Sequence, residues 1–106
     1  MNVDKILQEI GNEPLLSKQE EIELLKRIHN NDEAALEQLI RANMRFIVSL
    51  AAQYQGKGLS LDELINSGRE GIANTAEKYE STDESTFISY ATPIVRQSIL
   101  AAISKV

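Results

Sequence analysis

The chain contains no cysteine and only one histidine, so it offers few groups for covalent or metal chemistry. Without cysteine, disulfide bonds, a thiolate nucleophile and cysteine–zinc sites are excluded. The lone His29 has no second histidine to share a metal with, and we interpret it as a side chain that meets unpaired carbonyls at a helix end. The carboxylate pairs Glu20/Glu21 and Asp62/Glu63 fall in first helical turns, where they complement the helix dipole. We therefore expect a protein that is not an enzyme and holds no metal or cofactor.

Long apolar runs are also missing. No apolar run approaches the roughly 18 residues of a membrane span, and the first ten residues lack the apolar core of a signal peptide. The glycine-containing stretches GKG and GREG lack the spacing and the lysine of a phosphate-binding loop. These absences favour a cytoplasmic protein that does not associate with membranes.

Basic residues are too few for a protein that binds duplex DNA unaided. The 106 residues include 11 lysines and arginines against 16 acidic residues, for a net charge of -5. Because affinity for duplex DNA comes largely from basic groups that neutralise phosphates, another protein would have to supply most of the positive field. Contact with a single strand through stacking and base edges stays open.

Apolar residues recur at steps of three and four throughout the chain, which predicts an all-α fold. Capping boxes at Ser17–Glu20 and Ser60–Glu63 mark two helix starts. We expect one compact domain over residues 1–106 with about four to five helices, of which residues 1–30 form an N-terminal helical segment and 31–106 the remainder. The expected helices cover residues 2–10, 17–28, 33–54 and 60–79, with a last one that runs toward Lys105.

Three residues inside these helices need a special explanation. Gly68 and Gly71 each cost about 1 kcal/mol relative to alanine inside a helix, so we expect another backbone to come close there. Asn43 lies on the apolar stripe of the 33–54 helix, and a buried amide must be paired. Either it makes a structural hydrogen bond to a neighbouring loop, or it is a polar group that reaches a ligand.

Three of the five aromatic residues gather around an acidic segment, Ser81–Thr86. Tyr79, Phe87 and Tyr90 could be ordinary core residues. At a junction between a loop and a helix they could also stack an unpaired base. On the second interpretation, Asn43, Tyr79 and Tyr90 should lie on one shared outer surface.

Several segments resemble bacterial sigma-70 family factors of the primary type. They are KILQEIGNEPLLSKQEEIELLKRI, ANMRFIVSLA, YQGKGLS, DELI and FISYAT followed by RQSI, in order over nearly the whole chain. The resemblance corresponds to the promoter-melting domain (region 2) and the segment before it. It implies a helical fold of that type that binds the clamp helices of the largest subunit of the RNA polymerase core. It also implies capture of the single-stranded, non-template minus-ten promoter DNA, with two bases flipped into pockets.

The resemblance also implies roles for individual residues. The second flipped base would meet Asn43, the first would lie among Tyr79, Glu80 and Tyr90, and Gln97 would face the upstream base pair. Phe87 and Arg96 complete the expected DNA-facing set. The expected polymerase-facing set is Glu63, Asn66, Ser67 and Arg69.

The sequence departs from the family pattern on both surfaces. Pro93 and Ile94 replace a tryptophan pair that acts as a wedge at the edge of the melted DNA. Because proline inside a helix costs about 3 kcal/mol and Thr92-Pro93 is a good helix start, we expect the last helix to begin or kink near Thr92. Segment 81–86 is acidic or hydroxylic where the family has basic residues, and Arg69 and Glu70 alter the polymerase-facing surface.

These departures predict weak or absent DNA binding by the isolated chain. Two alternatives keep the fold. One is a sigma-like interaction module, a decoy or adapter that binds a partner helix in a groove without opening a promoter. The other is a scaffold that binds neither polymerase nor DNA.

Overall fold

The computed structural model describes residues 3–11, 15–80 and 86–106, and within these ranges it contains helices and no strand. The all-α prediction is confirmed, with one helix more than expected. Residues 81–85, most of the acidic segment named above, lie outside the described residues. The helices are α1 (Val3–Ile10), α2 (Lys18–His29), α3 (Glu33–Ala42), α4 (Met44–Ala52), α5 (Leu61–Lys78) and α6 (Phe87–Ser104).

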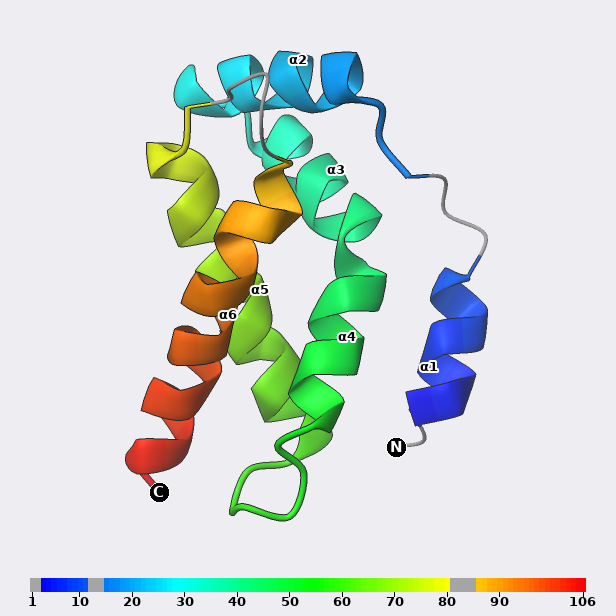
Figure 1. The fold of residues 1–106 in the computed structure, drawn as a ribbon, viewed down its shortest axis with the longest axis vertical. Coiled ribbons are helices and arrows are strands. Elements are labelled where there is room, and N and C mark those ends of the chain that lie inside the picture. Colours follow the sequence, from blue (N-terminus) through cyan, green and yellow to red (C-terminus); the bar gives the residue numbers. More distant parts are fainter. Residues whose placement is uncertain (1–2, 12–14, 81–85) are drawn as a thin grey trace.

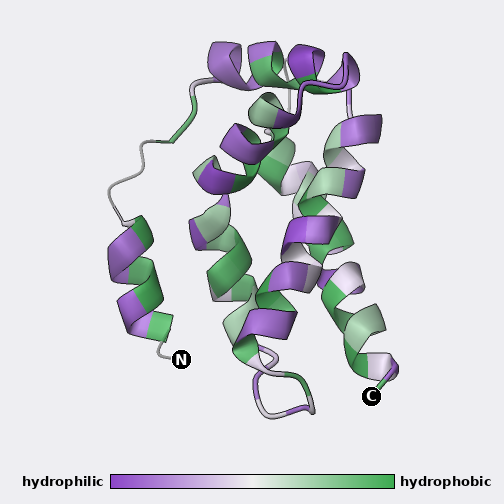
Figure 2. Ribbon diagram, turned by 180° about the vertical axis from the view of Figure 1, so that it is seen from behind, coloured by the Kyte–Doolittle hydropathy of each residue, from purple (hydrophilic) through white to green (hydrophobic). Residues whose placement is uncertain are grey.

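The helix α2 lies across one end of the group formed by α3 to α6, at the top of Figure 1. α5 and α6 run side by side, and α4 packs against α5. α1 lies outside this group and contacts α4, toward which it turns its apolar side (Figure 2). The guanidinium of Arg45 in α4 donates a hydrogen bond of 2.8 Å to the Gly11 carbonyl just after α1. Among the described helices, none combines the length and apolarity needed to cross a membrane.

The packing of α5 on α6 confirms the expected close approach of another backbone at Gly71, whereas only side chains from α4 and α6 come close at Gly68. A Cβ on Gly71 would lie 3.1 Å from the Val95 Cα and 2.9 Å from the Ser98 Oγ. A Cβ on Gly68 would lie 2.8 Å from the Ile47 Cγ2. The predicted apolar stripe of α5 is buried along its whole length; it comprises Leu61, Leu64, Ile65, Gly68, Ile72, Ala76 and Tyr79.

The expected single helix over residues 33–54 is wrong, because it is broken at Asn43. This residue has φ −106° and ψ 6°, ends α3 and precedes α4. Its side-chain Nδ2 donates to the Leu39 carbonyl at 2.8 Å, and its backbone N–H donates to the Ile40 carbonyl at 3.0 Å. Asparagine offers the backbone such local hydrogen bonds as an alternative to the helical ladder, which explains why the apolar pattern continues while the helix does not.

The last helix does not begin near Thr92. It begins at Phe87, where the side chain of Thr86 accepts a hydrogen bond from the Ser89 N–H, and it contains Pro93. Proline has no N–H to give to the Ser89 carbonyl, but Ser89 and Pro93 are both exposed, so water can replace that hydrogen bond. Four buried residues at a spacing of four, on both sides of the proline, hold the helix together: Phe87, Ala91, Val95 and Ile99.

Both predicted capping boxes are confirmed. The Ser17 Oγ accepts from the Glu20 N–H at 3.1 Å while the Ser17 N–H donates to the Glu20 carboxylate at 3.0 Å. Ser60 and Glu63 make the same pair of bonds at 3.2 and 3.1 Å. The backbone N–H of each serine, with a smaller contribution from its hydroxyl, holds the pKa of the paired glutamate below the ordinary value of 4.5.

Gly71→Ala should lower the free energy of unfolding by about 1–3 kcal/mol, because the new methyl group would press on the backbone of α6 at Val95. Asn74→Ala, at an exposed position of the same helix, is the matched control. It should leave stability unchanged or raise it by about 0.5 kcal/mol through helix propensity. Chemical denaturation followed by circular dichroism measures both, and a Gly71→Ala protein as stable as the parent would contradict the close contact.

The capping box of α5 should make stability depend on pH. Because the pKa of Glu63 is lowered in the folded protein, its contribution is present above the ordinary pKa of 4.5 and is lost as the pH falls through the lower folded pKa. Glu63→Gln should therefore be less stable than the parent at pH 7, and this difference should shrink toward pH 3. Thermal unfolding at both pH values tests this, with Glu70→Gln, outside the capping box, expected to change little at either pH. A Glu63→Gln difference that grows on acidification would contradict it.

Candidate functional site

An aromatic cluster joins the end of α5 to the start of α6. The Tyr79 ring meets the Phe87 ring edge-on, with centroids 5.5 Å apart, and lies 4.9 Å from the Tyr90 ring. Tyr79 is 5% exposed and Phe87 is fully buried, whereas Tyr90 is 50% exposed. The expectation that Tyr79 lies on an outer surface is wrong, and Phe87 is a core residue, because large aromatic rings are stabilised by burying their area against each other. Among the three rings of this cluster, Tyr90 alone is exposed to solvent.

Asn43 lies beside a small groove at the same end of α6. The groove has a volume of about 160 Å³ and joins residues from the N-terminal segment, the α3–α4 junction and the first turn of α6. Asn43 is 8% exposed, so it is not on an outer surface either, although it borders this groove. Its amide nitrogen bonds to its own preceding helix rather than to a neighbouring loop. The groove is lined by Leu15, Leu16, Glu21, Ala42, Asn43, Phe46, Thr86 and Ile88.

The sequence did not indicate that the N-terminal segment contributes to this groove. Leu15 and Glu21 come to line one groove with Thr86 only through the tertiary fold, and no spacing in the sequence indicates that arrangement. A weak signal was available for Phe46. This large apolar residue falls off the apolar stripe of its helix, and it is 40% exposed. Leu15, which is 64% exposed, lines the same groove, so two exposed apolar side chains lie together there.

The two remaining DNA-facing candidates on α6 differ in their surroundings. Arg96 is half-buried, and its guanidinium donates to the Tyr54 hydroxyl at 2.8 Å and to the Gln53 Oε1 at 3.2 Å. Gln97, the next residue, is exposed. Arg96 therefore ties α6 to the end of α4 through its Nη1, which fixes the position of its guanidinium. Glu80, directly after the cluster tyrosine, is exposed.

The polymerase-facing candidates lie on α5. Glu63, Asn66 and Ser67 follow helical spacing on one side, where the first two are exposed and Ser67 is half-buried. The Ser67 hydroxyl donates to the Glu63 carbonyl at 3.1 Å. Arg69 is turned toward α3, where its guanidinium lies 3.9 Å from the Glu37 carboxylate. Three of the four candidates thus share one polar face, and Arg69 borders it.

His29 caps a helix end, as expected, but the helix is not its own. Its Nε2 lies 3.0 Å from the Ala76 carbonyl in the last turn of α5. Because a carbonyl only accepts, Nε2 carries the hydrogen, and the bond ties the end of α2 to the end of α5. Across residues 3–11, 15–80 and 86–106, no group of three or more histidine and acidic side chains is arranged to hold a metal ion.

Comparison with known proteins gives two family matches and several close relatives. Residues 39–106 match Sigma-70 region 2, and residues 7–34 match Sigma-70 factor, region 1.2. The chain is 44% identical over 98 residues to the RNA polymerase sigma factor SigA of a Bacillus species, covering 92% of this chain and 26% of that protein. It is 43% identical over 98 residues to SigA of Clostridium acetobutylicum, with 92% and 26% covered. It is 38% identical over 97 residues to RpoS of Coxiella burnetii, with 92% and 28% covered. The chain thus spans about a quarter of the length of these relatives.

Substitutions in the aromatic cluster should separate the core residue from the surface residue. Tyr79→Ala should lower the free energy of unfolding by about 3–5 kcal/mol, because it removes a buried ring. Tyr90→Ala should cost about 1 kcal/mol, since it removes one aromatic contact from a half-exposed side chain. Equilibrium unfolding in urea measures both. Equal costs for the two variants would show that the burial assigned to Tyr79 is wrong.

Proposed function

The chain belongs to the sigma-70 family, and we propose that it is the part of such a factor that binds the RNA polymerase core and captures the non-template strand of the minus-ten element. Because sigma factors are non-enzymatic initiation factors, the chain is not an enzyme. Its partners in this proposal are the clamp helices of the largest polymerase subunit and single-stranded promoter DNA.

The observation that carries the strand-capture proposal is the meeting of two candidate base sites at the first turn of α6. Tyr90 offers a half-exposed ring on which an unstacked base can lie. Thr86 and Ile88 border the groove at Asn43, and no described residue donates a hydrogen bond to the Asn43 Oδ1. A base in this groove would therefore find an acceptor for its N–H groups and an apolar wall, the combination that reads flipped bases.

The polymerase-binding part of the proposal rests on the outer face of α5. Glu63 and Asn66 are exposed there, and the helix beneath them is held rigid by its capping box and by its buried opposite face. A rigid polar face of this kind suits a recognition surface for the helices of a partner. Glu70, seven residues after Glu63, adds a charge on this face, and Arg69 adds one at its border; the resemblance calls for neither.

Weak strand binding follows from the few groups on α6 that could contact a strand. Arg96 is the one basic residue of α6, and its Nη1 is held by Tyr54 and Gln53, so this helix offers a single positive charge to phosphates. Pro93 is exposed on the same helix where the family has a stacking wedge. Without these contacts, salt should compete effectively with the strand. The burial of Tyr79 and Phe87 leaves Tyr90 as the one exposed ring of the aromatic cluster, which is the observation that favours the adapter alternative.

The isolated chain should bind a minus-ten single strand more weakly than about 1 μM at ~0.15 M salt, and should bind polymerase clamp helices without it. Fluorescence titration with the oligonucleotide and capture on immobilised clamp helices, with and without the strand, measure these two activities. Sequence-selective binding tighter than about 1 μM would show that the lost aromatic and basic groups are unimportant. Clamp binding with no strand selection would favour the adapter, and binding to neither partner would leave only the scaffold.

Restoring the wedge provides the matched gain-of-function variant for this experiment. Pro93→Trp together with Ile94→Trp should tighten strand binding at least fivefold, since stacking of one base on an aromatic ring contributes about 1–3 kcal/mol. Pro93→Ala together with Ile94→Ala controls for removal of the proline and should not tighten it. Equal affinities for the two double variants would contradict a strand path over this part of α6.

A further inference from the structure

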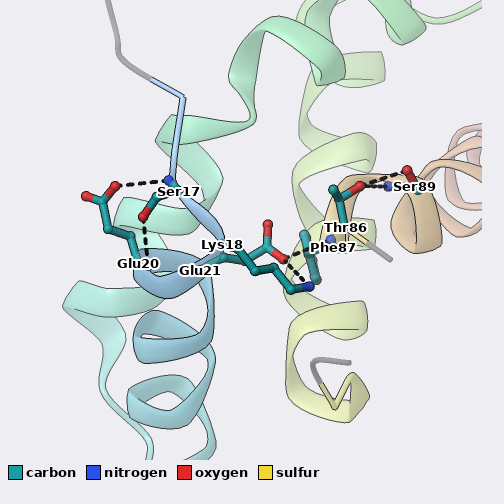
Figure 3. Close-up of polar contacts among 7 residues, drawn as sticks. All are labelled: Ser17, Lys18, Glu20, Glu21, Thr86, Phe87 and Ser89. Atoms are coloured by element: carbon teal, nitrogen blue, oxygen red, sulfur yellow. Dashed lines mark hydrogen bonds and ion pairs between the residues drawn. The ribbon is translucent and has the colours of Figure 1, made fainter. Parts of the chain in front are cut away.

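The carboxylate of Glu21 in α2 is bonded to the start of α6. Its Oε1 accepts a hydrogen bond of 3.0 Å from the backbone N–H of Phe87, 66 residues further along the chain (Figure 3). The Lys18 Nζ lies 3.6 Å from the same oxygen. The Glu21 side chain is only 13% exposed, so water competes little for this bond. A glutamate of the N-terminal segment therefore fixes a backbone atom at the first position of α6.

This contact acts as an N-terminal cap supplied from another helix. The first N–H groups of a helix have no partner within it, and the helix dipole favours a negative charge at that end. In α6, Thr86 caps the Ser89 N–H with its own hydroxyl at 3.3 Å. The Phe87 N–H is left for Glu21. Thr86 and Glu21 thus each accept a hydrogen bond from a different backbone N–H of the first turn.

The same glutamate borders one candidate base site directly and is linked to the other through Phe87. It lines the groove that also contains Asn43. Through the Phe87 backbone it also holds the residue whose ring packs edge-on against Tyr79, and Tyr79 in turn lies against the exposed Tyr90 ring. A shift of Phe87 away from α2 would therefore open the groove. The same shift would move the Tyr79 ring, against which the Tyr90 ring lies.

We propose that Glu21 is a positioning residue that couples the groove at Asn43 to the exposed ring of Tyr90, so that the N-terminal segment sets the geometry of both base sites. The coupling of base binding rests on the proposed function, whereas the positioning of α6 does not. The hydrogen bond needs an acceptor at the length of a glutamate side chain. A glutamine supplies one, and an aspartate, one methylene shorter, does not.

The positioning role is tested in the free protein with Glu21→Ala, Glu21→Asp and Glu21→Gln. Amide exchange measured by NMR should become about tenfold faster at Phe87 in the Ala and Asp variants, the loss expected for a removed helix cap, and should change less than threefold in the Gln variant. The Tyr90 ring resonances should move in the Ala and Asp variants alone. Glu23→Ala, at an exposed position of α2, is the matched control and should match the parent.

Unchanged Phe87 exchange and Tyr90 resonances in the Asp variant would overturn the positioning role, and so would equal changes in the Asp and Gln variants. Should Glu21→Ala fail to fold, the Asp and Gln pair still decides the question, because the two differ in reach. A merely destabilising substitution would speed exchange throughout the chain, whereas the proposed loss is local to the first turn of α6.

The coupling is tested with a minus-ten strand that is abasic at the position expected in the groove, so that only the Tyr90 site is filled. Glu21→Asp should bind this strand at least about threefold more weakly than the parent, and Glu21→Gln should restore binding, measured at low salt. Equal affinities of the Asp variant and the parent would overturn the coupling. If the parent itself binds no strand at low salt, the proposed function fails, while the exchange measurement still decides whether Glu21 positions α6.

Discussion

The close contact between α5 and α6 at Gly71 is the constraint on which the candidate site depends. With no side chain at this position, the backbone of α6 at Val95 can approach α5. That approach brings Tyr79 at the end of α5 against Phe87 and Tyr90 in the first turn and a half of α6. The aromatic cluster thus lies at the end of the same α5–α6 contact that Gly71 permits further down the two helices.

Hydrogen bonds between distant segments complete the site around this pair of helices. Glu21 holds the start of α6 from α2, and His29 holds the end of α5 from the same helix. α2 lies across the end of the bundle and so contacts both sides of the α5–α6 connection (Figure 1). The segment that matches Sigma-70 factor, region 1.2, is therefore a structural part of the surface formed with region 2.

Local signals in the sequence predicted the features that depend on neighbouring residues. The capping boxes, the apolar stripe of α5 and the close backbone approach at Gly71 all follow from spacing or from the cost of glycine in a helix. The break at Asn43 was not predicted, because its side chain competes for a carbonyl of its own helix while the apolar period continues. Pro93 was expected to start a helix, but the buried residues on both sides of it outweigh the lost hydrogen bond. The burial of Tyr79 and the contribution of Glu21 depend on contacts between distant segments, so the sequence alone did not indicate them.

The central claim is that the first turn of α6, with Asn43 beside it, is the surface that meets an unpaired strand. An NMR titration of the protein with a minus-ten single strand at low salt, up to about 1 mM strand, tests it most directly because it detects weak binding. If this surface meets the strand, the amide resonances of Asn43, Thr86 and Tyr90 should shift in a way that depends on the strand sequence. Shifts confined to the outer face of α5, or absent from these three residues, would contradict it.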